Sequence, residues 1–421
     1  MPDLIIKPAA QSGNKVIIQD QAGGAVITTA DSGATITSAT LTSPTINTPT
    51  IATPTITGAA TFSGDLVPST PLSHRNLVIN GGMQVWQRAT GATGAGNAYN
   101  TVDRYQFMQN TDGNYTSEKH PMSLADINTT GHATALALVC SVADTSIAAG
   151  QYAYIRHVIE AQNCQHLQWG TANAKTITLS FWVKSSLTGI YTVGMEKQDT
   201  TAYLYKKEYT INSANTWEKK TITISPTAGS TSLITGAGGI INNDNGAGLV
   251  LAFGLAWGSN YHGTNDSWAT TGWSTSNQVK WMNSTSNNLY IAGVQLELGS
   301  NATPFEHRSF ADELARCQRY YFQDDGHLQG AGYQNDYYHM DVTVPIPVPM
   351  RAQPTTTTTG GYIWRHNGYV SAGTNPPIAV QYWETYANNL YLKVSGVGWD
   401  SNSNGYVCVG YFNDLFVSAE L

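Results

Sequence analysis

Three pairs of carboxylates stand close enough together in the sequence to suggest acid–base chemistry. They are Asp324 with Asp325, Asp336 with Asp341, and Glu297 with Glu306. Hydrolysis of a glycosidic bond needs two carboxyl groups at a defined separation across that bond. Side chains an odd number of residues apart in one strand point to opposite faces, which argues against the first two pairs. A Gly-Ser-Asn turn would let Glu297 approach Glu306, but a structural ion pair with Arg308 or a neighbour is the favoured interpretation.

Other patterns of catalysis or metal binding are missing from the sequence. It contains no G-x-S-x-G nucleophile elbow, no H-E-x-x-H zinc motif and no P-loop. The glycine-rich residues 236–239 lack the Lys-Ser/Thr end of a phosphate loop and indicate a turn. Residues 242–246 offer oxygen ligands for Ca²⁺, but a plain Asn-Gly turn is favoured. We therefore predict no catalytic residue, no enzyme activity, no metal and no cofactor.

Aromatic side chains among small polar residues favour binding instead. Flat ring faces pack on the C–H surfaces of sugars, and amide or carboxylate groups bond the hydroxyls. One such stretch contains Trp257, Tyr261, His262, Trp268, Trp273 and Trp281. A second contains Trp364, Tyr382, Trp383, Tyr386, Tyr391 and Trp399. The alternative, that these rings fill cores or subunit interfaces, stays open for each residue.

Composition restricts the partners of the chain. Its 421 residues carry a net charge of −7, and only 12% are charged, about half of the roughly 25% usual in soluble proteins. The basic pairs Lys206-Lys207 and Lys219-Lys220 are too short to neutralise a row of phosphates and indicate solvated strand ends. We predict no nucleic-acid partner.

Cysteine use and the apolar segments indicate where the chain is made and whether it enters a membrane. None of the four cysteines lies in a C-x-x-C pattern, and we expect reduced, mostly buried thiols at Cys140, Cys164, Cys317 and Cys408. The first residues lack the pattern of a signal peptide, and the longest uncharged apolar run, 248–257, is too short to span a bilayer. We therefore predict synthesis in a cytoplasm, no membrane insertion and release by another route.

A five-residue repeat follows a small β-rich head at 1–28. Its apolar positions are Ile36, Leu41, Ile46, Ile51 and Ile56, with prolines in phase at 44, 49 and 54. One apolar residue in five cannot be buried within one chain, and in a plain strand successive repeats would face opposite sides. Residues 29–75 therefore predict a homotrimeric stalk and hinge in which these five residues form the core. A disordered Thr/Pro linker is the alternative.

The rest of the chain is patterned as β-structure. Alternating runs at 176–183, 190–195, 203–210, 220–224, 249–253 and 289–296 are separated by clusters of Gly, Asn and Ser. Such spacing predicts a β-sandwich or jelly roll at 76–321. Ser309 with Asp312 predicts a capped helix over 310–321 at its end. Residues 322–421 predict a second, aromatic-rich β domain.

Four segments of this middle domain resemble a module of phage tail-fibre and virion-fibre proteins. They are RNLVINGGMQVWQR at 75–88, TVDRY at 101–105, TITLSFWVKSS at 176–186, and VQLELGSNATPFEHR at 294–308 running on to CQRYY at 317–321. They occur in the family's order over more than half of the chain. The resemblance implies a carbohydrate-binding-like jelly roll displayed on phage particles, and it identifies no ligand.

The sequence therefore predicts an all-β virion protein with a trimeric stalk, a jelly roll and a C-terminal receptor-binding tip. The head at 1–28 would attach it to a phage tail or capsid protein, and the outer domains would bind a bacterial surface glycan or surface protein. Two alternatives stay open. One is a capsid fibre or decoration protein with accessory adhesion, and the other is a polysaccharide-depolymerising tailspike.

Overall fold

The structure is a computed structural model that describes residues 17–19, 25–30, 33–36, 73–94, 96–334, 339–365, 368–370, 379–386, 389–395 and 407–421. Contacts divide the chain into two units, Met1–Val67 and Pro68–Leu421. The described part of the chain contains no helix that is both long and apolar enough to cross a membrane.

The first unit contains a three-stranded antiparallel sheet. Its strands are β1 (Ile17–Gln19), β2 (Ala25–Ala30) and β3 (Gly33–Ile36) in sequential order. Ile36, the first apolar residue of the five-residue repeat, lies opposite Ile27 in this sheet. The sheet therefore extends past position 28 to Ile36. The other predicted stalk residues, Leu41, Ile46, Ile51 and Ile56, lie outside the described residues.

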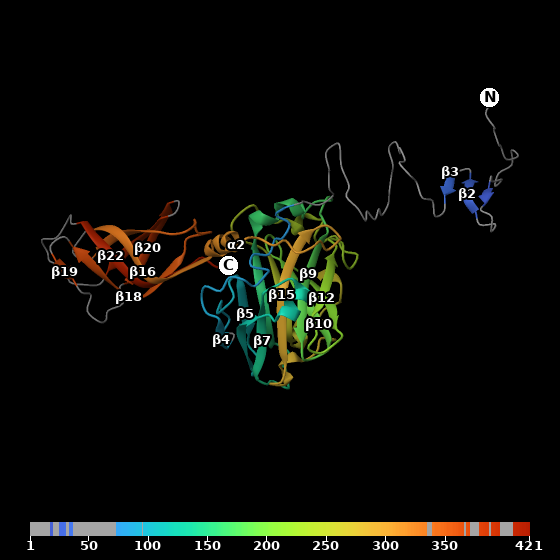
Figure 1. Cartoon of the computed structure of the whole chain (residues 1–421), viewed down its shortest axis with the longest axis horizontal. Coiled ribbons are helices and arrows are strands. Elements are labelled where there is room, and N and C mark those ends of the chain that lie inside the picture. Colours follow the sequence, from blue (N-terminus) through green and yellow to red (C-terminus); the bar gives the residue numbers. More distant parts are fainter. Residues whose placement is uncertain are drawn as a thin grey trace, which may run out of the picture. The chain divides into compact units, whose positions relative to one another are not determined.

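The second unit begins with a sandwich of two six-stranded sheets (Figure 1). The first sheet has the order β14 (Ser267–Ala269), β11 (Tyr203–Ile211), β10 (Gly189–Lys197), β13 (Ala247–Trp257), β8 (Tyr152–Glu160) and β5 (Tyr105–Gln109). The second has the order β12 (Glu218–Ile224), β9 (Ile177–Ser185), β15 (Asn288–Leu298), β7 (Thr134–Val142), β6 (Asn114–Pro121) and β4 (Gly91–Thr93). All six predicted runs are strands, and the predicted β-sandwich is confirmed.

Alternation along the strands explains why the two sheets pack together. In β9, Ile177, Leu179, Phe181 and Val183 are fully buried in the core, whereas Trp182 and Lys184 on the other face are partly exposed. Phe181 meets Phe253 of the other sheet edge to face, with ring centroids 5.1 Å apart. Such period-two burial places one hydrophobic core between the layers. Because strand β13 is buried at ten of its eleven positions, its outer side must be covered as well.

Two α-helices belong to this unit. Helix α1 (Leu124–Thr130) precedes β7, and α2 (Phe310–Gln318) follows β15. The Oγ atom of Ser309 accepts the amide of Asp312 at 3.1 Å, so the predicted cap is confirmed. The helix ends at Gln318, before the predicted Tyr321, because Tyr321 starts the next strand.

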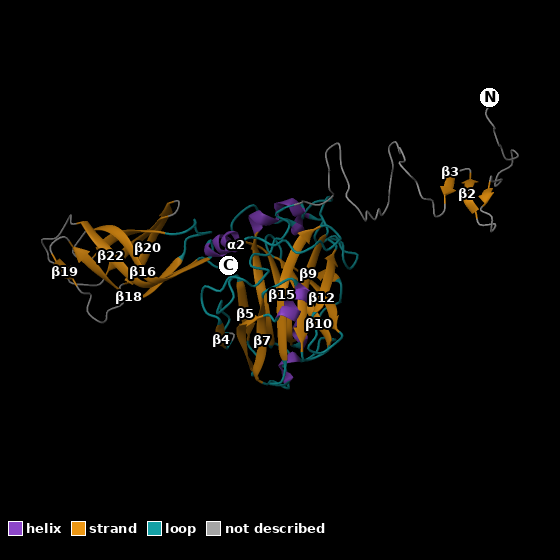
Figure 2. Ribbon diagram, in the orientation of Figure 1, coloured by secondary structure: helices purple, strands orange, loops and turns teal. Residues whose placement is uncertain are grey.

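The C-terminal residues form a seven-stranded sheet with its own small core. The order is β19 (Gly368–Val370), β18 (Thr355–Arg365), β22 (Val407–Ser418), β16 (Tyr321–Gln334), β17 (His339–Pro345), β21 (Asn389–Ser395) and β20 (Ala379–Tyr386). Its buried residues include Val342, Leu392 and Leu415. Strands β18 and β20 also contact each other, so the sheet curls on itself. Figure 2 shows how much of the described chain is strand.

A buried ion network holds the last residues of the chain on the sandwich. The Glu420 carboxylate accepts from Arg88 at 2.9 Å and also from Arg104, whose side chain is fully buried. The Arg104 guanidinium stacks over the Tyr320 ring at 3.4 Å. Removing one partner of such a pair leaves an uncompensated buried charge, at a cost of about 3–5 kcal/mol. A chain truncated before Glu420 would leave Arg104 unpaired.

Three of the four cysteines, Cys140, Cys164 and Cys317, are buried free thiols as predicted. The fourth, Cys408, lies on β22. Burial raises the pKa of each of the three buried thiols, so none of these three is an activated nucleophile. The predicted turn at 242–246 is present, since Asp244 accepts the amide of Gly246 at 2.8 Å.

Candidate functional site

Two neighbouring strands of the first sheet bring aromatic side chains to its outer side. Tyr152 of β8 lies opposite Trp257, the last residue of β13. Because Ala153 and Ile155 point into the core, alternation turns Tyr152 and Tyr154 outward. The loop after β13 then returns and adds Tyr261 and Trp273. We call Tyr152, Tyr154, Trp257, Tyr261 and Trp273 the aromatic platform.

The rings of the platform pack on one another in a fixed order. Trp257 and Trp273 are almost parallel, at 4° and 6.0 Å between centroids. Tyr154 stacks on Trp257 at 4.6 Å, and Tyr152 meets Tyr261 edge to face at 5.7 Å. Tyr154 and Trp257 are each 8% exposed, whereas the other three rings are half-buried. The half-buried rings therefore offer the surface that a ligand could cover.

Glycines beneath the platform allow the loop to lie directly on the sheet. A Cβ atom at Gly194 of β10 would stand 2.8 Å from Cε3 of Trp273. A Cβ atom at Gly254 of β13 would collide with the indole nitrogen of Trp257. Any residue larger than glycine at position 194 or 254 would therefore displace the ring above it.

The same loop buries a lysine that was expected at the surface. Lys206 of β11 is 0% exposed, and its ammonium donates to the carbonyl of Thr271 at 3.2 Å. The prediction of a solvated basic pair is therefore wrong at Lys206. The prediction fits Lys207 better, because its ammonium lies 2.6 Å from the carboxylate of the exposed Asp266. The buried ammonium ties the loop to the sheet on which the platform rests.

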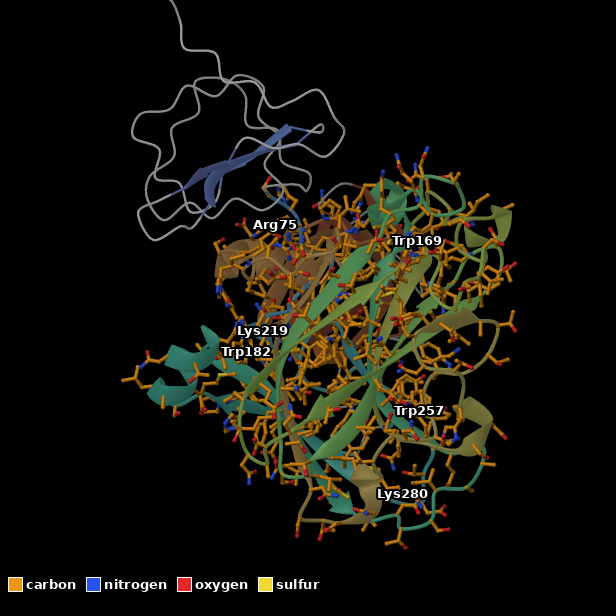
Figure 3. The ribbon with its side chains drawn as sticks, turned by 90° about the vertical axis from the view of Figure 1, so that its right-hand side faces the viewer. Arg75, Trp169, Trp182, Lys219, Trp257 and Lys280 are labelled. Carbon is orange, nitrogen blue, oxygen red and sulfur yellow. The ribbon has the colours of Figure 1, made fainter. Side chains whose placement is uncertain are left out.

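A pocket of about 190 Å³ opens beside the platform. Its lining comprises Ile147, Ala256, Trp257, Gly258, Ser259, His262, Ser276, Gln278, Val279 and Lys280. Among the described residues, the indole nitrogen of Trp257 and the amide nitrogen of Gln278 are buried without a hydrogen-bond partner, and so are the indole nitrogens of Trp217 and Trp281. Figure 3 shows Trp257 and Lys280 on the same part of the sandwich, away from Trp169 at its other end.

Two predicted site residues of this stretch lie in the core instead. Trp268 is 2% exposed, and its indole nitrogen donates to the carbonyl of Ser225 at 2.9 Å. Trp281 is 0% exposed and meets Tyr115 edge to face at 6.3 Å. Because neither ring reaches the surface, the prediction that these two bind a ligand is wrong.

The described residues of the second predicted cluster lie on two strands of the C-terminal sheet. Trp364 lies on β18 opposite Val409, and Tyr382, Trp383 and Tyr386 lie on β20. Trp383 falls at an irregularity in the pairing of β20 with β21. Trp399 lies outside the described residues. Ligand binding at these positions stays a prediction.

Two of the carboxylates considered for catalysis, Glu297 and Glu306, hold loops in place. Glu297 is 1% exposed and accepts from the amide of Thr303 at 2.8 Å. Glu306 accepts from the amide of Asn76 at 2.9 Å and pairs with Arg308 at 3.2 Å, as the structural interpretation predicted. Asp324 and Asp341 lie on β16 and β17, and Asp336 lies outside the described residues.

Two groups of aromatic residues were not predicted from the sequence. Tyr152 and Tyr154 of the platform carry a usable signal, because their spacing of two in a strand puts both rings on one face. The second group lies on the outer side of the other sheet, where Trp182, Trp217 and Tyr290 belong to one cluster and Lys184 lies over Trp217 and Tyr290. We call these four residues the opposite face.

A lysine covers the rings of the opposite face. The ammonium of Lys184 lies 4.9 Å from the ring centroid of Trp217 and 4.6 Å from that of Tyr290. His120 packs on Tyr290 at 4.8 Å. The faces of these rings are therefore occupied by groups of the chain itself.

Comparison with known proteins finds the sandwich in several solved structures. No protein-family profile and no curated protein sequence matches this chain. A provisionally assigned sugar-binding protein from Bacteroides thetaiotaomicron is 13% identical, covering 53% of this chain and all of that one, with a TM-score of 0.31. A family 4 carbohydrate-binding module is 14% identical over 53% of this chain and 99% of its own, with a TM-score of 0.26.

A phage protein is also among these structures. The enzymatically active domain of tailspike protein 4 from bacteriophage CBA120 is 14% identical over 53% of this chain and 21% of its own, with a TM-score of 0.25. At such scores the likeness is to a β-sandwich and carries no functional argument.

Proposed function

We propose that this chain is a fibre protein of a bacteriophage virion that adheres to glycans of the bacterial surface through its aromatic platform. One observation carries the proposal of binding: the half-buried rings of Tyr152, Tyr261 and Trp273 lie beside a pocket of about 190 Å³ whose lining includes serine, histidine, glutamine and lysine side chains. Ring faces with nearby polar groups suit a sugar, whose faces are apolar and whose edge is polar.

The proposal of a virion fibre rests on sequence. The repeat at 36–56 offers one apolar residue in five, which three chains around an axis could bury together. The segments at 75–88, 101–105, 176–186 and 294–321 resemble those of phage fibres. We propose a homotrimer on the virion surface, attached by its N-terminus to a tail protein and without catalytic activity. Three subunits would turn weak single contacts into firm adhesion.

A binding assay with the full chain tests the proposal. Labelled protein is added to a panel of bacteria and to mutants that lack capsule or lipopolysaccharide sugars. We expect binding to at least one strain and its loss from the glycan-deficient mutants. The variant Trp383→Ala, on β20, reports whether the C-terminal sheet makes a second contact. Binding that survives every loss of surface sugar would overturn the glycan proposal.

Light scattering tests the oligomer. We expect a mass three times that of the 45.3 kDa chain. Replacing Ile46 and Ile51 by Asn should lower this mass while leaving the sandwich folded, because both changes lie in the repeat. A monomeric wild-type protein would contradict the stalk. Gold-labelled antibody on virions then distinguishes a tail fibre from a capsid fibre.

A further inference from the structure

Two charged side chains lie beside the platform on the outer side of the first sheet. Arg156 of β8 lies two residues after Tyr154, a platform residue. Because Ile155 between them is buried in the core, alternation turns Arg156 to the same side as Tyr154. Glu196 of β10 lies two residues after Gly194, on which a platform ring rests. Both charged side chains therefore project from the face that carries the platform.

The register of the sheet shows how far apart the two side chains begin. Ala252 of β13 lies opposite Arg156 on one side and opposite Gly194 on the other. Arg156 and Glu196 are thus two strands and two residues apart, which is roughly 12 Å between Cα atoms at the usual spacings of a sheet. Burial raises the pKa of the Tyr154 hydroxyl to about 12, whereas Arg156 lowers this pKa and Glu196 raises it. Both charged groups therefore lie within electrostatic range of the Tyr154 hydroxyl.

A neighbouring glutamine holds each charged group and leaves other atoms of that group open. Nε of Arg156 donates to Oε1 of Gln106 at 2.6 Å. Oε2 of Glu196 accepts from Nε2 of Gln198 at 3.1 Å. Within the part of the chain that the structure describes, the terminal nitrogens of Arg156 and Oε1 of Glu196 make no hydrogen bond, and no ion pair joins the two side chains. These atoms are accessible to solvent on half-buried residues, so a ligand can reach them.

The two charged groups require opposite partners. A guanidinium can only donate hydrogen bonds, and an ionised carboxylate can only accept them. A sugar hydroxyl does both, so the hydroxyls of one glycan can bind Arg156 and Glu196 together. An acidic sugar would be repelled by Glu196, and an amino sugar would be repelled by Arg156. An uncharged sugar is the class that satisfies both groups.

We propose that Arg156 and Glu196 bind hydroxyl groups of uncharged sugar residues whose flat faces lie on the platform, so that the glycan is neutral where it meets the protein. The rings supply contact area, and the two charged groups select the orientation and the charge of the sugar. Their separation of roughly 12 Å at the backbone, shortened by two long side chains, suits one or two consecutive sugar residues. This inference rests on the proposed function and adds the chemical class of the ligand and two residues that select it.

The dependence of binding on salt tests the charge of the ligand. Capsular polysaccharide and the O-chain of lipopolysaccharide are purified from a strain that the full-length chain binds. Affinity is measured by calorimetry in about 0.1 M and about 1 M NaCl, between which the Debye length falls from about 10 Å to about 3 Å. Because hydrogen bonds to an uncharged ligand are little screened, we expect the affinity to fall less than about threefold. A larger loss would indicate a charged ligand and would overturn the inference. If neither preparation binds, the proposed function itself fails.

Paired variants of the full-length chain test the two side chains. Arg156→Gln and Glu196→Gln each remove one charge-assisted hydrogen bond and should each weaken binding about tenfold or more. Both sites are half-buried, so thermal unfolding is measured beside binding and should change little. An affinity like that of the wild type in either variant would overturn the inference and leave the proposed function standing.

Two exposed residues of the second sheet provide matched controls. Lys219→Gln on β12 removes a positive charge, and Glu118→Gln on β6 removes a negative one. Figure 3 shows Lys219 well apart from Trp257 of the platform. Both controls should bind within about twofold of the wild type, because neither changes a charge beside the platform. Losses in the controls as large as those at Arg156 and Glu196 would show an effect of net charge alone and would overturn the inference.

Discussion

The two outer sides of the sandwich carry similar aromatic residues in different chemical states. On the opposite face, Lys184 lies over both Trp217 and Tyr290, so a cation of the chain covers the rings. On the platform, the rings stack on one another, and the described residues place no Lys or Arg over them. The difference teaches that the accessibility of the ring faces, rather than the number of rings, distinguishes a binding surface from a self-covered one.

The largest expected effect is a loss of stability on replacing Trp281, a core residue from the same stretch of sequence as the platform residues Trp257 and Trp273. Trp281→Ala should lower the free energy of unfolding by about 3–5 kcal/mol, because it empties a fully buried site. Urea unfolding followed by circular dichroism measures the change. Glycan affinity per folded molecule should stay within twofold of the wild type. A loss of binding without a loss of stability would contradict the assignment of Trp281 to the core and would indicate that it contacts the ligand.

The next prediction compares two equally buried tryptophans, one on the platform and one on the opposite face. Trp257 and Trp217 are each 8% exposed, so replacing either by Ala should destabilise the fold to a similar degree. Only Trp257→Ala should weaken glycan binding, by about 30-fold if it is a central contact worth roughly 2 kcal/mol. Surface plasmon resonance on immobilised polysaccharide measures both. An equal loss for Trp217→Ala would place the ligand on the opposite face as well.

These tryptophans show what the sequence could and could not predict. Strands such as β9 were predictable because residues 177–183 alternate in polarity, and the Ser309 cap was readable from its spacing to Asp312. Trp257, Trp268, Trp273 and Trp281 occur within one polar stretch, and nothing local separates them. Their burial depends on how the loop lies on β10 and β13, which the glycines at 194 and 254 permit. Such long-range packing has no local signal.

Acid should destabilise the sandwich through a buried imidazole next to β15. His132 packs on Gly293, and desolvation together with His307 lowers the pKa of His132 to about 4. In the unfolded chain this group takes up its proton near pH 6.5, so the unfolded state binds more protons between pH 6.5 and 4. Its contribution is therefore complete above pH 6.5 and is lost as the pH falls toward 4, by about 2–3 kcal/mol at most. The variant His132→Gln should flatten the stability profile over this window in thermal unfolding.

His157 provides the check on that assignment. It is also buried, and desolvation lowers its pKa well below the ordinary value, so it adds to the acid sensitivity in the same direction. The His132→Gln profile should therefore retain some slope below pH 6.5. An unchanged slope would show that His132 does not titrate differently in the folded and unfolded states.

The smallest effect concerns the lysine that covers the opposite face. Lys184→Gln should lower stability by about 0.5–1 kcal/mol, since it removes a cation from over two rings at a partly exposed site. It also uncovers the faces of Trp217 and Tyr290. If a covering cation is what keeps this side from binding, the variant should gain weak affinity for the polysaccharide that the platform binds, detectable by saturation-transfer NMR in a Trp257→Ala background. No gain would mean that bare rings are insufficient and that other features of the platform decide binding.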